Sequence, residues 1–305
     1  MPNILIAGEL HPSGLEIINQ NSKYSINYLK EVSNENFLPY LKNADALIIR
    51  TQNFKKNHIE RAKKLKIVSR HGVGYDNVDY HELKKRNIPL TIVGDVNSTS
   101  VSEHTMMLII SVFKKIILAD FSTRNSLWNY RNNYEPRELY GKNLLIIGFG
   151  RIGKKLGKLA KAFGMNIHVY DPYIENKFDE YEIRYFQNLT TALCDADCIS
   201  LNLPKVDKPI ITKENSQYLK HGVVIINTAR GELIEEKVLL DGLQKGVIFG
   251  VGLDVFDNTI VSGDAQTIQM DVELQLDINR NNILQETVDQ KEINQVHTLI
   301  KNTFF

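Results

Sequence analysis

The sequence has little that would direct the protein to a membrane or to nucleic acid. No apolar run approaches the ~20 residues that a bilayer-spanning helix needs, and the first strand pattern begins at Asn3 without a basic, cleavable leader. The 37 Lys and Arg residues are balanced by 36 Asp and Glu residues, so no net field attracts a polyanion. We therefore expect a soluble, cytoplasmic protein that binds neither membrane nor nucleic acid.

Cysteine is equally scarce. The two cysteines, Cys194 and Cys198, have no further cysteine or nearby histidine that could complete a zinc site. We expect buried thiols in a reducing compartment and no metal. The chain also lacks internal repeats and low-complexity linkers, and its 305 residues are enough for two domains of ordinary size. No appended regulatory domain is expected after residue 305.

Short apolar runs alternate with amphipathic segments, a rhythm that predicts parallel sheets covered by helices. The expected strands are Asn3–Ala7, Ala46–Ile49, Lys66–Ser69, Leu90–Val93, Asn143–Ile147, Asn166–Tyr170, Cys198–Leu201, Val223–Asn227 and Ile248–Leu253. The expected helices include Ser33–Lys42, Lys56–Lys64, Glu235–Gln244 and one long unbroken helix, Ser98–Arg124. That long helix must bury its apolar stripe against another domain or subunit.

One motif carries most of the functional information. The strand pattern ending at Ile147 runs into Gly148-Phe-Gly150-Arg151-Ile152-Gly153 and then into an amphipathic helix. A turn of this kind brings backbone N–H groups and a helix N-terminus to a pyrophosphate. Asp171 follows the next strand pattern, where an acid accepts hydrogen bonds from the ribose hydroxyls and repels a 2′-phosphate. The sequence therefore predicts a dinucleotide site for NAD rather than NADP.

Three further motifs follow predicted strands. Gly72-Val73-Gly74 lies in the segment Arg70–Asp79, and such a turn exposes N–H groups that can hold a carboxylate. Arg230 lies in Asn227–Glu232, and Asp254 ends the strand pattern that closes with Gly252–Phe256. Ligands bind at the carboxyl ends of strands in doubly wound sheets, so we expect these residues to face a ligand.

With these motifs in order, the chain resembles the D-isomer-specific 2-hydroxyacid dehydrogenases, and most closely their D-3-phosphoglycerate dehydrogenase branch. The resemblance covers about residues 3–256. It also includes the strand end Ile49–Thr51, the segment Ser102-Glu-His-Thr105 and the pair Leu203-Pro204.

The resemblance implies an α/β fold of two doubly wound parallel-sheet domains, one flavodoxin-like and one Rossmann-like, with a cleft between them. Residues 1–95 plus 283–305 would form the substrate domain, and residues 96–282 would form the NAD-binding domain. It implies a 2-hydroxy or 2-oxo acid substrate and a homodimer in which the long helix lies at the interface.

The resemblance also implies roles for individual residues. Arg230 would bind the substrate carboxylate and polarise the carbonyl, the Gly72–Gly74 loop would bind the carboxylate, and Arg50 and Arg70 would approach a substrate phosphate. The residues expected to bind NAD are Gly148, Gly150, Arg151, Ile152, Gly153, Asp171, Leu203, Pro204, Thr228, Ala229 and Asp254.

The family pattern breaks after residue 256. Hydride transfer requires a proton acceptor, which the family supplies as a histidine in a Pro-His pair, oriented by a glutamate. Here Thr259 stands at the glutamate position and Gln285-Glu286-Thr287 where Pro-His belongs. His71, Glu286 and His297 are the substitutes considered.

Two hypotheses follow from this break. The first is an NAD-dependent oxidoreductase of 2-hydroxy acids with a divergent acid/base. The second is a catalytically impaired paralogue that keeps the NAD site and has a binding, sensing or structural role. Because the usual dyad is missing, we expect 2-hydroxyacid dehydrogenase turnover to be low or undetectable compared with an intact family member.

Overall fold

The computed structural model describes residues 1–20, 22–133, 135–174 and 182–256. The chain divides into two compact units, Met1–Ser98 and a unit that begins at Thr99, and each is described by itself. The expected association of residues 283–305 with the first unit lies outside the described residues. None of the described helices has the length and apolar character required to cross a bilayer.

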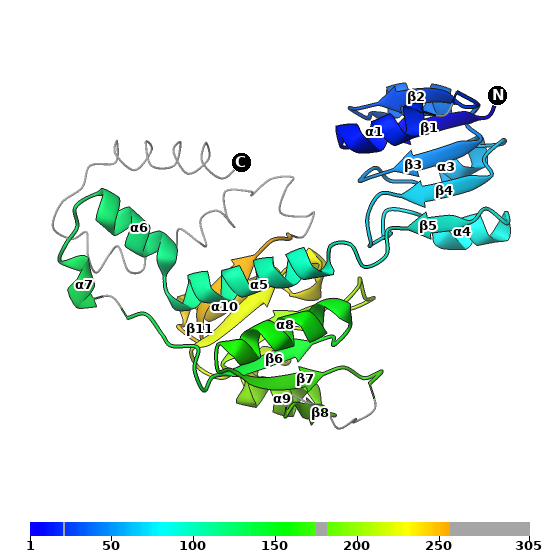
Figure 1. The fold of residues 1–305 in the computed structure, drawn as a ribbon. Coiled ribbons are helices and arrows are strands. Elements are labelled where there is room, and N and C mark those ends of the chain that lie inside the picture. The colour runs from blue at the N-terminus through cyan, green and yellow to red at the C-terminus, as the bar shows by residue number, and fades with distance from the viewer. Residues whose placement is uncertain (21, 134, 175–181, 257–305) are drawn as a thin grey trace. The chain divides into compact units, whose positions relative to one another are not determined.

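The first unit is built on a five-stranded parallel sheet (Figure 1). Its order is β2-β1-β3-β4-β5, a flavodoxin-like order in which the second strand lies at one edge. The strands are β1 (Asn3–Ala7), β2 (Ser25–Leu29), β3 (Ala46–Ile49), β4 (Ile67–Arg70) and β5 (Leu90–Ile92). The helices are α1 (Pro12–Asn19), α2 (Asn34–Leu41), α3 (Lys56–Arg61) and α4 (Tyr80–Lys85).

The hydrophobic core of this unit lies between one face of the sheet and three helices, α2, α3 and α4. Leu5 and Ala7 of β1 contribute to it, whereas the alternate residues of the strand point to the other face. Phe37 of α2, Ile59 of α3 and Leu83 of α4 pack against that face and are fully or almost fully buried. Burial of these apolar side chains fixes the strand register and hence the loops at the carboxyl edge of the sheet.

The second unit has a six-stranded parallel sheet with the order β11-β10-β9-β6-β7-β8. In chain order this is the Rossmann arrangement, with the reversal between β6 and β9. The strands are β6 (Asn143–Ile147), β7 (Asn166–Tyr170), β8 (Arg184–Phe186), β9 (Cys198–Leu201), β10 (Val223–Asn227) and β11 (Ile248–Leu253). The helices are α5 (Ser98–Phe113), α6 (Ile116–Arg124), α7 (Tyr130–Asn133), α8 (Arg151–Ala162), α9 (Leu189–Asp195) and α10 (Glu236–Gln244), with short 3₁₀ turns at η1 (Ser216–Tyr218) and η2 (Gly231–Leu233).

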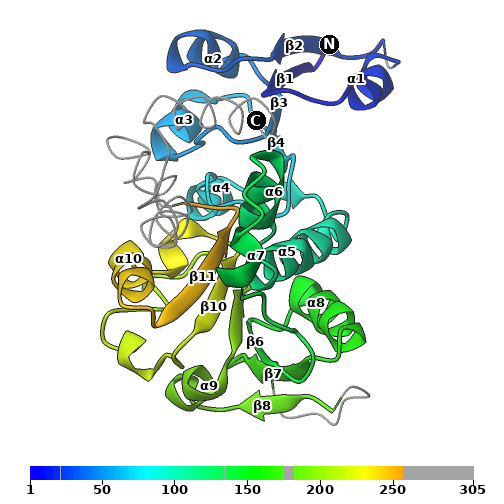
Figure 2. The same ribbon diagram turned by 90° about the vertical axis from the view of Figure 1, so that its left-hand side faces the viewer.

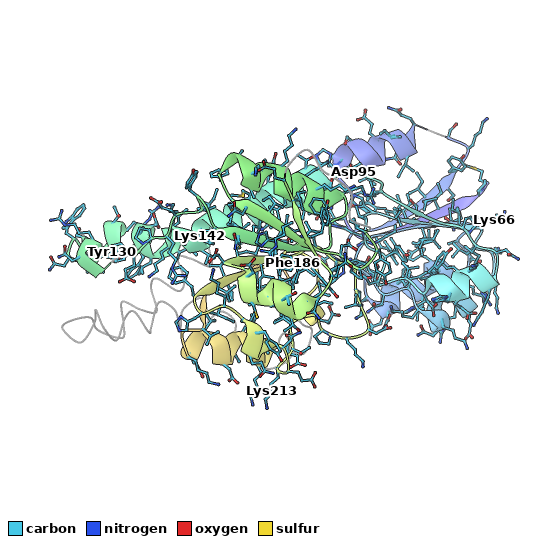
Figure 3. All side chains as sticks on the ribbon, turned by 90° about the horizontal axis from the view of Figure 1, so that it is seen from below. Lys66, Asp95, Tyr130, Lys142, Phe186 and Lys213 are labelled. Carbon is cyan, nitrogen blue, oxygen red and sulfur yellow. The ribbon has the colours of Figure 1, made fainter. Side chains whose placement is uncertain are left out.

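Helices cover both faces of the second sheet, and α8 and α10 lie on opposite sides of it (Figure 2). Leu144 and Ile146 of β6 pack in the core that contains Leu156 of α8. The alternate residue Leu145 packs in the other core, with Leu239 of α10. Because both faces are covered, the central strands are continuous apolar runs rather than alternating ones. Charged side chains such as Lys213 lie on the surface (Figure 3).

Two expectations are wrong. The segment Ser98–Arg124 is not one helix, because it breaks between α5 and α6, where Lys115 adopts a left-handed backbone conformation with φ of 47°. Backbone pairing explains the break: the N–H of Arg137 donates to the carbonyl of Phe113, the last residue of α5. Of the two thiols expected to be buried, Cys198 is buried in the sheet but Cys194 is exposed.

Candidate functional site

The turn between β6 and α8 places three glycines where side chains would not fit or would obstruct a ligand. Gly148 has a φ of +89°, and a Cβ atom there would lie 2.7 Å from the carbonyl oxygen of Asn202. A Cβ atom at Gly153 would collide with the carbonyl oxygen of Gly148, so this glycine allows α8 to pack against the turn. At Gly150 a Cβ atom would meet nothing within 4 Å, so the backbone there faces open space.

That open space lies at the N-terminus of α8. Gly150 is the N-cap residue and supplies no side-chain cap, and Arg151, Ile152 and Gly153 form the first turn. The N–H groups of a first helical turn have no partner within the helix, and the helix dipole favours an anion there. The turn therefore fits the pyrophosphate of a dinucleotide.

Asp171 follows β7, next to this turn. Its Oδ2 accepts a hydrogen bond from the backbone N–H of Phe149 at 2.9 Å, and its Oδ1 accepts one from the N–H of Tyr173 at 3.0 Å. Each carboxylate oxygen can accept a second hydrogen bond. The carboxylate therefore stabilises the glycine turn and can still accept hydrogen bonds from a ribose.

The other half of the carboxyl edge is formed by the ends of β9, β10 and β11. Leu203 and Pro204 follow β9, Thr228, Ala229 and Arg230 follow β10, and Asp254 follows β11. Since all six strands are parallel, these residues lie at the same edge of the sheet as Gly148 and Asp171.

The side chain of Asn227 shapes the turn after β10. It is buried, its Oδ1 accepts from the N–H of Ala229 at 3.0 Å, and its Nδ2 donates to the carbonyl of Arg230 at 2.8 Å. Its own carbonyl accepts from the N–H of Asp254 at 3.0 Å. Asn227 thus links the Arg230 turn to the end of β11. Asn227 was not among the predicted site residues, although an asparagine at a strand end is a signal for such a turn.

Arg230 itself is half-buried, with an extended backbone, and its Nη1 donates to the carbonyl of Ala229 at 2.6 Å. A guanidinium group carries five N–H donors in a planar fork that matches a carboxylate. Its place at the end of β10 suits it to bind an anionic substrate group beside a bound dinucleotide.

Two residues of α5 also reach this edge. Thr105 is buried, and its hydroxyl lies 2.9 Å from that of Thr228. His104 Nε2 lies 3.6 Å from Asp254 Oδ1. Both belong to the segment Ser102–Thr105 that carried part of the family resemblance, but no site role was predicted for either.

The first unit holds the second group of predicted site residues. Arg50 follows β3, Arg70 ends β4, and the loop Gly72-Val73-Gly74 comes next. Gly72 has a φ of +152°, and a Cβ atom there would collide with the guanidinium of Arg70, which donates to the carbonyl of His71. The arginine therefore lies against the loop whose N–H groups were predicted to hold a carboxylate.

Asn77 joins these parts. Its Oδ1 accepts from Arg70 Nε at 3.3 Å, and its Nδ2 donates to the carbonyls of Arg50 and Gln52, at 3.3 and 2.7 Å. Burial, followed by the charges of Arg50 and Arg70, lowers the pKa of His71. The cluster is cationic, and His71 is neutral at pH 7. Of the three proposed acid/base substitutes, Glu286 and His297 lie outside the described residues, as does Thr259.

The sheet order of the second unit and its glycine turn define a protein with a dinucleotide-binding Rossmann domain. Residues 4–134 match the catalytic domain, and residues 106–275 the NAD-binding domain, of the D-isomer specific 2-hydroxyacid dehydrogenases. The chain belongs to this family, and its second unit is the family's NAD-binding domain. The resemblance found in the sequence is confirmed.

Individual relatives agree with this assignment. A D-3-phosphoglycerate dehydrogenase of Methanocaldococcus jannaschii is 36% identical over 261 residues, which are 84% of this chain and 49% of that protein. A glyoxylate reductase of Pyrococcus furiosus is 28% identical over 84% of this chain and 79% of its own length. The chain spans about half the length of the phosphoglycerate dehydrogenases that it matches.

Solved structures show the same fold. The D-lactate dehydrogenase of Aquifex aeolicus, solved with NAD and lactic acid, superposes with a TM-score of 0.76 at 25% identity, over 97% of this chain and 84% of its own.

Proposed function

We propose that the protein is an NAD-dependent oxidoreductase that interconverts a D-2-hydroxy acid and its 2-oxo acid, and that D-3-phosphoglycerate is the first substrate to test. The observation that carries the proposal is the position of Arg230, at the end of β10 and on the same sheet edge as the glycine turn. A guanidinium fork at this position suits the carboxylate of a hydroxy acid.

The NAD cofactor supplies a hydride acceptor or donor when it is bound. The chain's own residues do the rest. Gly148–Gly153 and Asp171 hold the dinucleotide, Arg230 binds and polarises the substrate, and Leu203, Pro204, Thr228, Ala229 and Asp254 line the remaining edge. Arg50, Arg70 and Gly72–Gly74 of the first unit bind the anionic groups of the substrate. The cationic cluster around His71 supports a second anionic group such as a phosphate, because guanidinium binds phosphate bidentately.

Oxidation of the hydroxyl group also needs a proton acceptor. His71, Glu286 and His297 are the proposed candidates, and replacing each by alanine would identify the one that acts. His71 is neutral at pH 7 because its pKa is lowered, so it is able to accept a proton.

The activity is tested by steady-state oxidation of NADH with a panel of 2-oxo acids that includes phosphohydroxypyruvate. Arg230→Lys keeps the charge but loses the fork, and charge-assisted bonds contribute ~1.5–3 kcal/mol. We expect kcat/KM, and the affinity for oxalate, to fall by about 10- to 100-fold. Arg124→Lys, an exposed residue of α6 paired with Asp120, is the matched control.

Equal oxalate affinity in Arg230→Lys and the native protein would show that the anchor lies elsewhere. Tight NADH binding without turnover of any 2-oxo acid would instead support the impaired paralogue with a binding, sensing or structural role.

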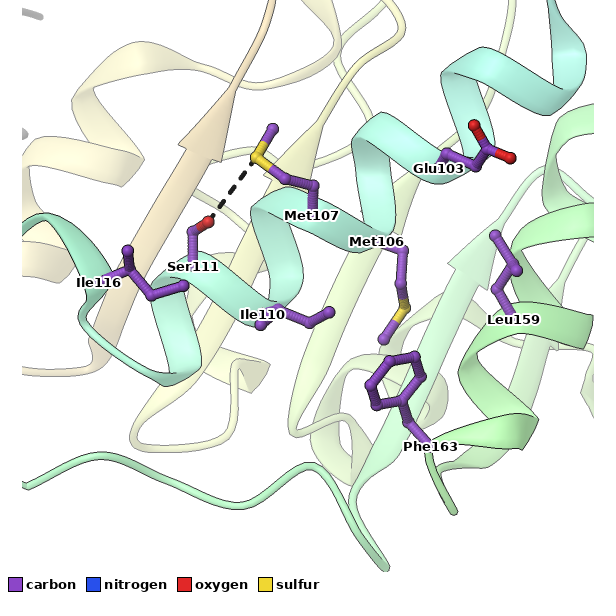
Figure 4. A pocket seen from close by; sticks show the side chains of 8 residues that line it. All are labelled: Glu103, Met106, Met107, Ile110, Ser111, Ile116, Leu159 and Phe163. Carbon is purple, nitrogen blue, oxygen red and sulfur yellow. Dashed lines mark hydrogen bonds between the residues drawn. The ribbon is translucent and has the colours of Figure 1, made fainter.

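We also propose that the protein forms a homodimer through α5. A cavity of about 290 Å³ lies between α5 and the end of α8, and its lining is almost entirely apolar (Figure 4). Met107 and Phe163 line it and are nearly half exposed, and Ile116 at the start of α6 is equally exposed. Contiguous exposed apolar side chains of this kind mark association surfaces.

A further inference from the structure

The order of the second sheet assigns the two nucleosides of NAD to different halves of its carboxyl edge. The dinucleotide crosses the edge where the strand order reverses, between β6 and β9. Asp171 after β7 takes the adenosine ribose and the glycine turn after β6 takes the pyrophosphate. The nicotinamide half must then lie over the ends of β9, β10 and β11, where Asp254 lies. This step rests on the NAD site of the proposed function.

The packing of α5 holds His104 next to the half of the edge assigned to the nicotinamide, at the ends of β10 and β11. The hydroxyls of its neighbour Thr105 and of Thr228 are 2.9 Å apart. One turn further along α5, Leu108 packs so tightly on β11 that a Cβ atom at Gly252 would lie 3.0 Å from Leu108 Cβ. His104 Nε2 is 3.6 Å from Asp254 Oδ1, with side chains 43% and 54% exposed, so both groups remain open to a ligand.

We propose that His104 is a positioning residue that acts through Asp254 and sets how strongly the site prefers oxidised over reduced cofactor. The nicotinamide ring carries a positive charge in NAD⁺ and none in NADH. The Asp254 carboxylate therefore favours NAD⁺, since opposite charges attract. When His104 is protonated its imidazolium neutralises that carboxylate, and the preference for NAD⁺ decreases.

Other charged residues lie on the described elements around His104. Glu103 precedes it on α5 and is exposed, Arg230 follows β10, and Lys155 of α8 donates to Thr99 more than one turn earlier on α5. The carboxylate within 4 Å of the imidazole is that of Asp254. Protonation of the imidazole would neutralise this carboxylate, so the ratio of the NAD⁺ and NADH dissociation constants should change between pH 8 and pH 5.5.

The test measures both dissociation constants across this range, with NADH followed by its fluorescence and NAD⁺ by calorimetry. In the native protein the ratio of Kd(NAD⁺) to Kd(NADH) should rise about threefold as the pH falls, the size expected for a partly exposed pair. His104→Gln should hold the ratio at its pH 8 value throughout. Asp254→Asn should raise the ratio at pH 8, because the carboxylate that favours NAD⁺ is gone, and the double variant should match Asp254→Asn at that pH.

His221→Gln is the matched control, because this exposed histidine precedes β10 at the opposite edge of the sheet. It should behave as the native protein does. An unchanged pH dependence in His104→Gln, or an unchanged ratio in Asp254→Asn at pH 8, would overturn the inference, as would failure to bind either form of the cofactor. If the protein binds both forms of the cofactor but turns over no substrate, the dehydrogenase proposal fails and the inference about His104 stands, because the two dissociation constants do not depend on catalysis.

Discussion

At the scale of single residues, Asp171 shows how one carboxylate has two tasks. It accepts the N–H of Phe149, which stabilises the glycine turn, and it stands where an adenosine ribose is expected. A negative charge there repels the 2′-phosphate of NADPH. Asp171→Asn removes the charge and keeps an oxygen that can accept from Phe149.

We expect Asp171→Asn to reduce the preference for NADH over NADPH by about tenfold, or ~1.4 kcal/mol. It should lower the melting temperature, because the amide keeps only one of the two oxygens that accept from Phe149 and Tyr173. Asp171→Ala should lose the same preference and lower the melting temperature further. Calorimetric titration with both cofactors, alongside thermal unfolding, checks this. Equal affinity of the native protein for NADH and NADPH would refute the assignment of Asp171.

His168 predicts a pH dependence of stability. It is buried in β7, and burial lowers its pKa despite Asp195 Oδ2 at 3.6 Å from its Nδ1. The folded state therefore favours the neutral ring, whereas the unfolded chain takes up a proton near pH 6.5. Stability is full above this pH and decreases as the pH falls from about 6.5 toward the lower folded-state pKa.

Denaturant unfolding between pH 8 and pH 5 measures this loss in the native protein and in His168→Gln. His168→Gln should lose less folding stability across that range than the native protein does. His221→Gln, which removes an exposed histidine, should lose as much as the native protein. An identical slope in His168→Gln and the native protein would show that other groups cause the acid sensitivity.

At the scale of elements, two glycines of the turn between β6 and α8 have different roles: Gly153 is needed for packing, and Gly150 leaves space for the ligand. A Cβ atom at Gly153 would collide with the Gly148 carbonyl oxygen, whereas one at Gly150 meets open space at a φ of −78°. Gly153→Ala should therefore destabilise the second unit by about 1–3 kcal/mol through overpacking. Gly150→Ala should leave the stability unchanged and weaken NADH binding, because its methyl group occupies the space predicted for the pyrophosphate.

Thermal unfolding and NADH titration of the two variants check this pair of expectations. Comparable melting temperatures for both variants would contradict the packing argument, and unchanged NADH affinity in Gly150→Ala would contradict the phosphate position.

The elements that sequence patterns predicted well are the buried ones. Expected and observed bounds agree for β6, β7, β9 and β10, because strands covered on both faces are continuous apolar runs. They also agree for β11, an edge strand in which buried and partly buried residues alternate. The missed strands, β2 and β8, each lie at one edge of their sheet and are partly exposed, so their apolar pattern is weak. The break at Lys115 has no local signal, since the partner of the Phe113 carbonyl is Arg137, more than twenty residues later.

The residues of the candidate site also differ in whether a local sequence pattern predicts them. Glycines and Asp171 were predictable because the strand–turn–helix pattern requires them locally. Asn77 donates to the carbonyls of Arg50 and Gln52, more than twenty residues earlier, and His104 reaches Asp254 through the way α5 packs on the end of β11. These two roles follow from the tertiary structure and not from spacing. Asn227 differs, because its side chain bonds within its own turn, and an asparagine at a strand end is a local signal for that turn.

At the scale of the whole molecule, the apolar cavity between α5 and α8 bears on assembly. Met107, Ile110 and Ile116 line it, and Ile117 of α6, next to it in the sequence, is 53% exposed. Leaving these side chains in water costs free energy that a second copy of the chain would remove by burying them. The sulfur of Met107 accepts a hydrogen bond from Ser111 within α5 at 3.7 Å, so its side chain is held along the helix (Figure 4).

We expect sedimentation velocity at micromolar concentration to give twice the mass of one chain. Met107→Lys places a charge in the predicted interface and should shift the protein to monomers, because an unpaired charge resists burial. Ile17→Lys, an equally drastic change on an exposed position of α1, should leave the dimer intact. A monomeric native protein at tens of micromolar, or a Met107→Lys variant that remains dimeric, would show that α5 does not form the interface.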